Sequence, residues 1–111
     1  MKIVFRFNNQ SRIIPSNIKT LIFGINQNDK PCCSSKSSSL KLQLAEIDIP
    51  QTSGATKWRL RCLGSLDGQT VGFTRDELRE VLAVGNSYDL DFGQEASLQS
   101  ARFTLTQEED R

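Results

Sequence analysis

The side chains that could carry out chemistry are few in this chain of 111 residues. Histidine is absent and only three cysteines occur, so acid–base catalysis would depend on carboxylates, lysines, Tyr88 or a cysteine. Cys62 falls on the apolar face of a predicted strand and is expected to be a small core residue. Because no nucleophile can be placed beside a base, the sequence predicts a protein that is not an enzyme.

The candidate metal and phosphate sites are equally incomplete. Cys32 and Cys33 are adjacent, but structural zinc normally takes four cysteine or histidine ligands, which the chain does not supply. Asp89 and Asp91 project from one face of a predicted strand, where a Ca²⁺ or Mg²⁺ ion would still need several more oxygen ligands. No glycine pattern matches a phosphate-binding loop. The sequence therefore predicts neither a metal nor a cofactor.

The most specific functional surface in the sequence is a row of basic residues. Lys57, Arg59 and Arg61 are two positions apart, so on a strand their side chains share one face at a spacing of about 7 Å. Lys41 and Arg6 are candidates to extend the surface. Such a row can hold carboxylates bidentately, and it can equally follow phosphates. These five residues are the predicted binding residues.

The row leaves several functions open. The first is a small interaction or adaptor module that binds another protein or a second copy of this chain, through a sheet edge, a helix face, the serine-rich loop or the basic row. The alternative is a nucleic-acid-binding accessory protein, although the formal charge is only +1 and Trp58 alternates to the core side, where it cannot stack on bases. In a third interpretation the arginines pair with cross-strand acids such as Asp89 or Asp91 and serve solubility alone. We favour protein binding.

Composition indicates where the protein works. No apolar run approaches the ~18–20 residues that span a bilayer, and the chain starts directly with the strand-like Lys2–Asn8, so we expect no membrane segment and no signal peptide. An odd number of cysteines, two of them adjacent, does not suit a secreted disulfide framework. The sequence predicts a cytoplasmic protein.

The elements that position the basic row are predicted between Thr56 and Phe92. Residues 57–66 alternate between apolar and polar, and Asp67-Gly68 predicts a two-residue turn that would pair Cys62 with Phe73 on the next strand.

A helix is then predicted over residues 74–84. Thr74 and Glu77 form a capping box, Leu78 and Val81 begin an apolar stripe, and Gly85 suits a left-handed cap at the end.

Further strands are predicted by alternation along the rest of the chain. Their ranges are Lys2–Asn8, a short edge strand at Arg12–Ile14, Ile18–Asn26, Leu40–Pro50, Ser87–Gly93 and Leu98–Gln107. In Leu40–Pro50 the apolar parity changes, which predicts a β-bulge near Ala45-Glu46 or a change of sheet.

Together the elements predict an α+β fold in one domain, residues 1–111. Six to seven mostly antiparallel strands would form a curved sheet or partly open barrel, with the helix on one face or at one end. Residues 27–39 are expected to be a flexible serine-rich loop and residues 108–111 a solvated tail.

Overall fold

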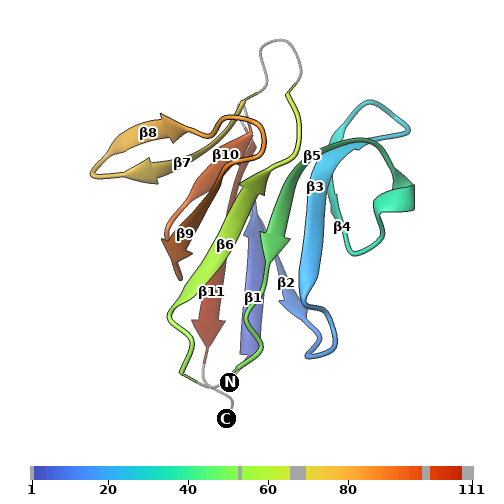
Figure 1. Cartoon of the computed structure of the whole chain (residues 1–111). Coiled ribbons are helices and arrows are strands. Elements are labelled where there is room, and N and C mark those ends of the chain that lie inside the picture. Colours follow the sequence, from blue (N-terminus) through green and yellow to red (C-terminus); the bar gives the residue numbers. More distant parts are fainter. Residues whose placement is uncertain (1, 53, 66–69, 99–100, 109–111) are drawn as a thin grey trace.

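The chain folds into two antiparallel β-sheets that pack face to face (Figure 1). The structure is a computed structural model, and it describes residues 2–52, 54–65, 70–98 and 101–108. The six-stranded sheet has the order β2-β1-β11-β10-β7-β8, with bounds β2 Gln10–Ile14, β1 Lys2–Phe7, β11 Ala101–Glu108, β10 Ala96–Leu98, β7 Val71–Arg75 and β8 Leu78–Val81. The five-stranded sheet has the order β4-β3-β5-β6-β9, with bounds β4 Pro31–Ser34, β3 Thr20–Asn26, β5 Leu40–Asp48, β6 Lys57–Cys62 and β9 Ser87–Asp91.

The core lies between the two sheets and is built by the period-2 alternation of the strands. On β6, Trp58, Leu60 and Cys62 are buried while the three basic residues are exposed. Phe23 of the five-stranded sheet and Phe103 of the six-stranded sheet stack at a centroid distance of 4.8 Å, so the aromatic contacts join the two layers. This burial of one face of each sheet is what holds a β-sandwich together.

The irregularity predicted in the strand after residue 40 is confirmed as a bulge. On β5, Ala45 is opposite Phe23 and Gln43 is opposite Gly24, which leaves Leu44 as an extra residue on β5. Leu44 and Ala45 are both buried. The bulge explains why the apolar parity of this strand changes.

The predicted helix over residues 74–84 is wrong. Residues 71–81 form the β7–β8 hairpin, in which Thr74 is opposite Arg79. The turn residues Asp76 and Glu77 have φ angles of 52° and 66°, which are left-handed, whereas a helix needs φ near −63°. Leu78, the start of the predicted apolar stripe, is 69% exposed.

Burial by the second sheet decides the conformation of this segment. Phe73 stacks on Tyr88 of β9 at a centroid distance of 4.0 Å, and the Thr74 N–H donates to the Glu95 carbonyl at 2.8 Å. Thr74 therefore belongs to a sheet ladder and caps no helix. An isolated helix of this length is marginal in water, so tertiary pairing overrides the local capping signal.

The predicted pairing of Cys62 with Phe73 is also wrong, because β6 and β7 belong to different sheets. Cys62 is opposite Ala45 on β5, and Phe73 lies between Glu80 and Ala96. The predicted turn at Asp67-Gly68 lies outside the described residues.

The fold class therefore has to be corrected from α+β to β-sandwich. The described residues contain eleven strands and no α-helix, only the short 3₁₀ turn η1 (Ser37–Ser39). None of these residues belongs to a helix long and apolar enough to cross a membrane. Within the serine-rich segment 27–39 lie β4 and η1, and its mobility stays a prediction. Of the predicted tail, Glu108 is the last residue of β11, and residues 109–111 lie outside the described residues.

Candidate functional site

The predicted basic row is present on the solvent face of β6, but two of its members are ion-paired. Lys57 Nζ lies 2.8 Å from Asp91 Oδ1, and Arg59 Nε lies 2.9 Å from Asp89 Oδ1, both across the β6–β9 ladder. The hydrogen bond from Arg59 lowers the pKa of Asp89, and the hydrogen bond to Asp91 raises the pKa of Lys57. These two pairs follow the cross-strand interpretation, in which the positive charge of the row is largely neutralised.

The other three predicted binding residues do not share one site. Arg61 is exposed on the row and has no ion-pair partner in the described part of the chain. Lys41 pairs with Asp29 at 2.6 Å near the far end of β5. Arg6 lies on the other sheet, where it contacts Glu108 at 2.9 Å. The structure therefore brings together only residues 57, 59 and 61.

A second arginine, Arg12, occupies a different environment that the sequence analysis did not select. The inner face of β1 is formed by Ile3, Phe5 and Phe7. Their partners on β2 are, in the same order, Ile14, Arg12 and Gln10. Arg12 therefore stands at an inward-facing position of an edge strand, beside the buried Phe5. The next residue, Ile13, takes an outward position and is largely exposed.

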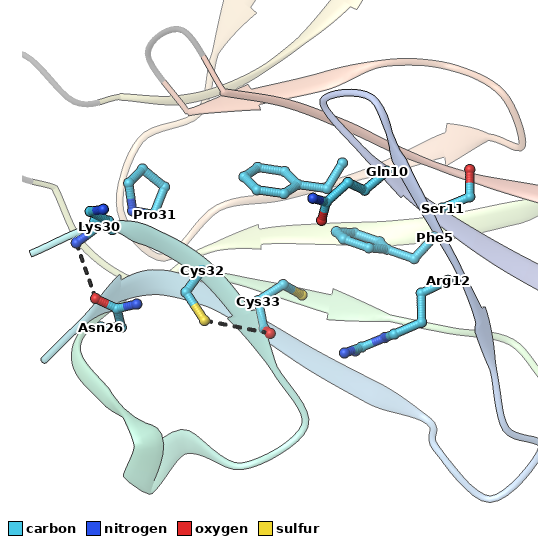
Figure 2. A pocket seen from close by; sticks show the side chains of 10 residues that line it. Phe5, Gln10, Ser11, Arg12, Asn26, Lys30, Pro31, Cys32 and Cys33 are labelled. Atoms are coloured by element: carbon cyan, nitrogen blue, oxygen red, sulfur yellow. Dashed lines mark hydrogen bonds between the residues drawn. The ribbon is translucent and has the colours of Figure 1, made fainter. Parts of the chain in front are cut away.

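The facing wall comes from β4, the edge strand of the other sheet. Cys33 is opposite Phe23, and Pro31 is opposite Ile25. Because Phe23 and Ile25 are buried, Cys33 and Pro31 share the inward face of β4. Between β2 and β4 the sandwich opens into a hollow of about 460 Å³, which we call the edge groove (Figure 2). This volume lies in the range of small-ligand pockets. The lining residues are Phe5, Phe7, Gln10, Ser11, Arg12, Asn26, Lys30, Pro31, Cys32 and Cys33.

The electrostatics of the edge groove are unbalanced toward positive charge. Figure 2 shows Arg12 extending from β2 toward Cys33 on β4. Burial raises the pKa of the Cys33 thiol to about 12, although the nearby Arg12 charge acts to lower it. Cys33 is therefore a neutral thiol at physiological pH and does not neutralise Arg12. Among the described residues, the lining includes two cations, Arg12 and Lys30, and no aspartate or glutamate.

The remaining described arginines have partners within the fold: Arg75 lies 3.6 Å from Glu80, Arg102 lies 3.7 Å from Glu95, and Arg79 is hydrogen-bonded. Arg79 donates to Ser97 Oγ at 2.8 Å and to Thr70 Oγ1 at 3.0 Å. The described residues contain no group of three or more histidine, cysteine, aspartate or glutamate side chains that could hold a metal ion. A neutral thiol beside an arginine is a poor nucleophile, because the thiolate is the reactive form. The chemistry that the groove can perform is recognition of an anion.

Comparison with known proteins adds one relationship. No protein-family model matches the chain, and no curated protein is similar to it in sequence. The fold is similar to that of a solved structure, the crystal structure of the FHA domain of the CT664 protein from Chlamydia trachomatis. The TM-score is 0.61 and the sequence identity 18%, over 98% of this chain and 100% of the other. This chain therefore has an FHA-like β-sandwich fold.

Proposed function

We propose that this chain is a non-enzymatic interaction module that binds an extended, anionic segment of a partner protein in the edge groove, with a phosphorylated side chain as the tightest form. The observation that carries the proposal is Arg12, a cation at an inward-facing position of an edge strand, in a groove whose described lining residues include no acid. Arg12 is exposed and has no ion-pair partner among the described residues. An anionic ligand would supply it.

The groove suits a ligand with both apolar and charged groups. Phe5 and Phe7 form an aromatic floor, and Phe7 is only half-buried, with its ring 5.3 Å from that of Phe23. An apolar side chain could cover this ring while a neighbouring anion contacts Arg12. The guanidinium presents a planar fork of donors, which matches the oxygens of a carboxylate or phosphate.

The fold supports the same ligand class. FHA domains are among the modules that recognise phosphorylated or acidic motifs through arginine side chains. A phosphate carries close to two charges and three acceptor oxygens, so it should bind Arg12 more tightly than a carboxylate does.

The test is a binding titration by fluorescence anisotropy. The probes are short peptides in which valine and serine alternate around a central phosphothreonine, glutamate, threonine or lysine. We expect affinity to fall in that order, and Arg12→Gln to weaken the phosphothreonine probe by about tenfold to hundredfold, the range for one hydrogen-bonded charge. Arg59→Gln is the matched control and should leave affinity unchanged. Equal binding of the lysine probe, or an Arg12→Gln variant that binds as well as wild type, would overturn the proposal.

A further inference from the structure

Alternate residues of β1 hydrogen-bond to β11 and to β2, and this alternation determines which backbone groups of β2 are free. The Asn8 N–H donates to the Arg102 carbonyl at 3.0 Å, so this residue pair belongs to the hydrogen-bonded pairs between β1 and β11. Bonded and non-bonded pairs alternate in an antiparallel ladder, so the backbone groups of Phe5 and Phe7 point the other way, toward β2. There they meet Arg12 and Gln10.

The intervening residues of β2 consequently point away from the sheet. Ser11 and Ile13 each direct a backbone N–H and C=O outward from an edge strand. The described residues place no further strand on this side. Four backbone groups are therefore available, at the mouth of the groove that contains Arg12.

The opposite wall of the groove, the edge strand β4, is protected against pairing with an added strand. On β4, the Asn26 N–H donates to the Lys30 carbonyl at 2.9 Å, so the groups of Cys32 point toward β3 and those of Pro31 and Cys33 point outward. Proline has no N–H to donate, which protects an edge. Of the two edges that border the groove, β2 is the one that can accept a strand.

We propose that the anionic segment binds by adding as a strand to the free edge of β2. This inference rests on the proposed function and specifies how the ligand is held. Alternate side chains of an added strand face opposite sides of the sheet. One set, with the anionic group, would enter the groove beside Arg12. The other set, which should be apolar, would lie on the outer face beside Ile13, which is 58% exposed.

The other end of the same sheet lacks this combination. The β8 edge exposes Leu78 and Val81, but Arg79 is already bonded to Ser97 and Thr70. Charge complementarity thus selects the β2 edge, and an alternating apolar and anionic peptide from a partner protein as its occupant.

Amide hydrogen exchange measured by NMR reads the pairing directly. On saturation with the phosphothreonine probe, the Ser11 and Ile13 amides should exchange at least about tenfold more slowly, because new strand bonds protect them. The Arg12 amide, which points toward β1, should be unchanged. If the probe binds in an Arg12-dependent way and neither amide slows, strand addition is overturned while the proposed function stands. If wild type binds no probe, both are overturned.

A variant tests the same point through affinity. Ile13→Pro removes an outward N–H at an edge position where proline is tolerated, and should weaken the probe by tenfold or more at an unchanged melting temperature. Ile13→Val keeps the N–H and should bind normally. If Ile13→Pro does not fold, the probe is modified instead. N-methylation of either its odd-numbered or its even-numbered residues removes alternate N–H groups, and only one of these two sets should abolish binding. Equal effects of both sets would overturn the inference. So would self-association of the protein that Arg12→Gln abolishes, because the occupant would then be a second copy.

Discussion

The arginines of the edge groove and of the basic row differ in whether the fold supplies them with a counter-charge. Arg59 projects from the solvent face of β6 and is bonded to Asp89 at 2.9 Å, whereas Arg12 faces from β2 into a hollow with no acid among its described lining residues. In the row, pairing dominates and lowers the pKa of Asp89. In the groove, burial dominates and raises the pKa of Cys33 to about 12.

This difference shows that strand position decides whether a cation is available for recognition. A row of three basic residues is conspicuous in a sequence, but the neighbouring strand supplies Asp91 and Asp89 as counter-charges to two of them, Lys57 and Arg59. Arg12, at the edge of the sandwich, has no acidic partner in the part of the chain that the structure describes. A charge without an ion-pair partner is more available to a ligand than a paired one, because no existing ion pair has to be displaced.

The largest expected effect concerns the burial of the Cys33 thiol in the groove. A pKa of about 12 leaves roughly a thousandfold less thiolate at neutral pH than the ordinary value of 9.0, so folded Cys33 should react with iodoacetamide about a thousandfold more slowly than in urea. Mass spectrometry of a Cys32→Ser variant isolates the Cys33 signal. Equal rates in the folded and unfolded protein would show that the Cys33 thiol is exposed to water, and the contrast with the row would disappear.

The next effect separates the groove floor from the opposite side of the sandwich. Phe7 and Tyr88 are both half-buried aromatic residues, Phe7 against Phe23 at 5.3 Å and Tyr88 against Phe73 at 4.0 Å. Alanine at either position should lower the free energy of unfolding by about 1–3 kcal/mol, less than a fully buried phenylalanine. Only Phe7→Ala should also weaken the phosphothreonine probe, by about tenfold. Parallel losses of affinity would show that binding follows general stability and does not depend on the groove.

Much of the strand pattern could be predicted because alternation is local. The strand at Lys2–Asn8, the edge strand at Arg12–Ile14 and the irregular strand after Leu40 all agree with the structure. Each depends on the order of apolar and polar residues within one segment. The helix could not be excluded in this way, since its capping signal is also local and Asp76-Glu77 is an unusual sequence for a turn with two positive φ angles.

The groove was missed for a different physical reason. A two-residue turn at Asn8-Asn9 would have placed Arg12 opposite Phe5, and thus on the inner face, from the sequence alone. The wall that contains Cys33 could not be predicted, because β2 and β4 belong to different sheets and meet only when the sheets pack. Local patterns define the faces of a strand, and the approach of two edges is a property of the whole sandwich.

A smaller effect is expected from the basic row, whose role in binding stays a prediction. The double substitution of Arg59 and Arg61 by alanine should change affinity for the phosphothreonine probe by less than about threefold, since Arg59 is paired with Asp89, Arg61 is exposed, and neither lines the edge groove. The same variant should be compared with wild type in partner pull-down, sizing and nucleic-acid binding at two salt concentrations. Loss of protein association, or loss of a salt-dependent affinity for DNA or RNA, would make the row a contact surface in its own right.

The smallest expected effect concerns the contribution of the Arg59–Asp89 ion pair to stability. Because Arg59 lowers the pKa of Asp89 in the folded protein, the pair should stabilise the fold above the unfolded pKa of about 3.9 and lose that contribution as pH falls through the lower folded value. Asp89→Asn should therefore be slightly less stable than wild type in urea at pH 7 and equally stable near pH 2. A difference that grows toward low pH would reverse the sign. If no difference is found at any pH, Arg59 is held so weakly that a partner could take it from Asp89 almost without cost, and the row would be nearly as available as Arg12.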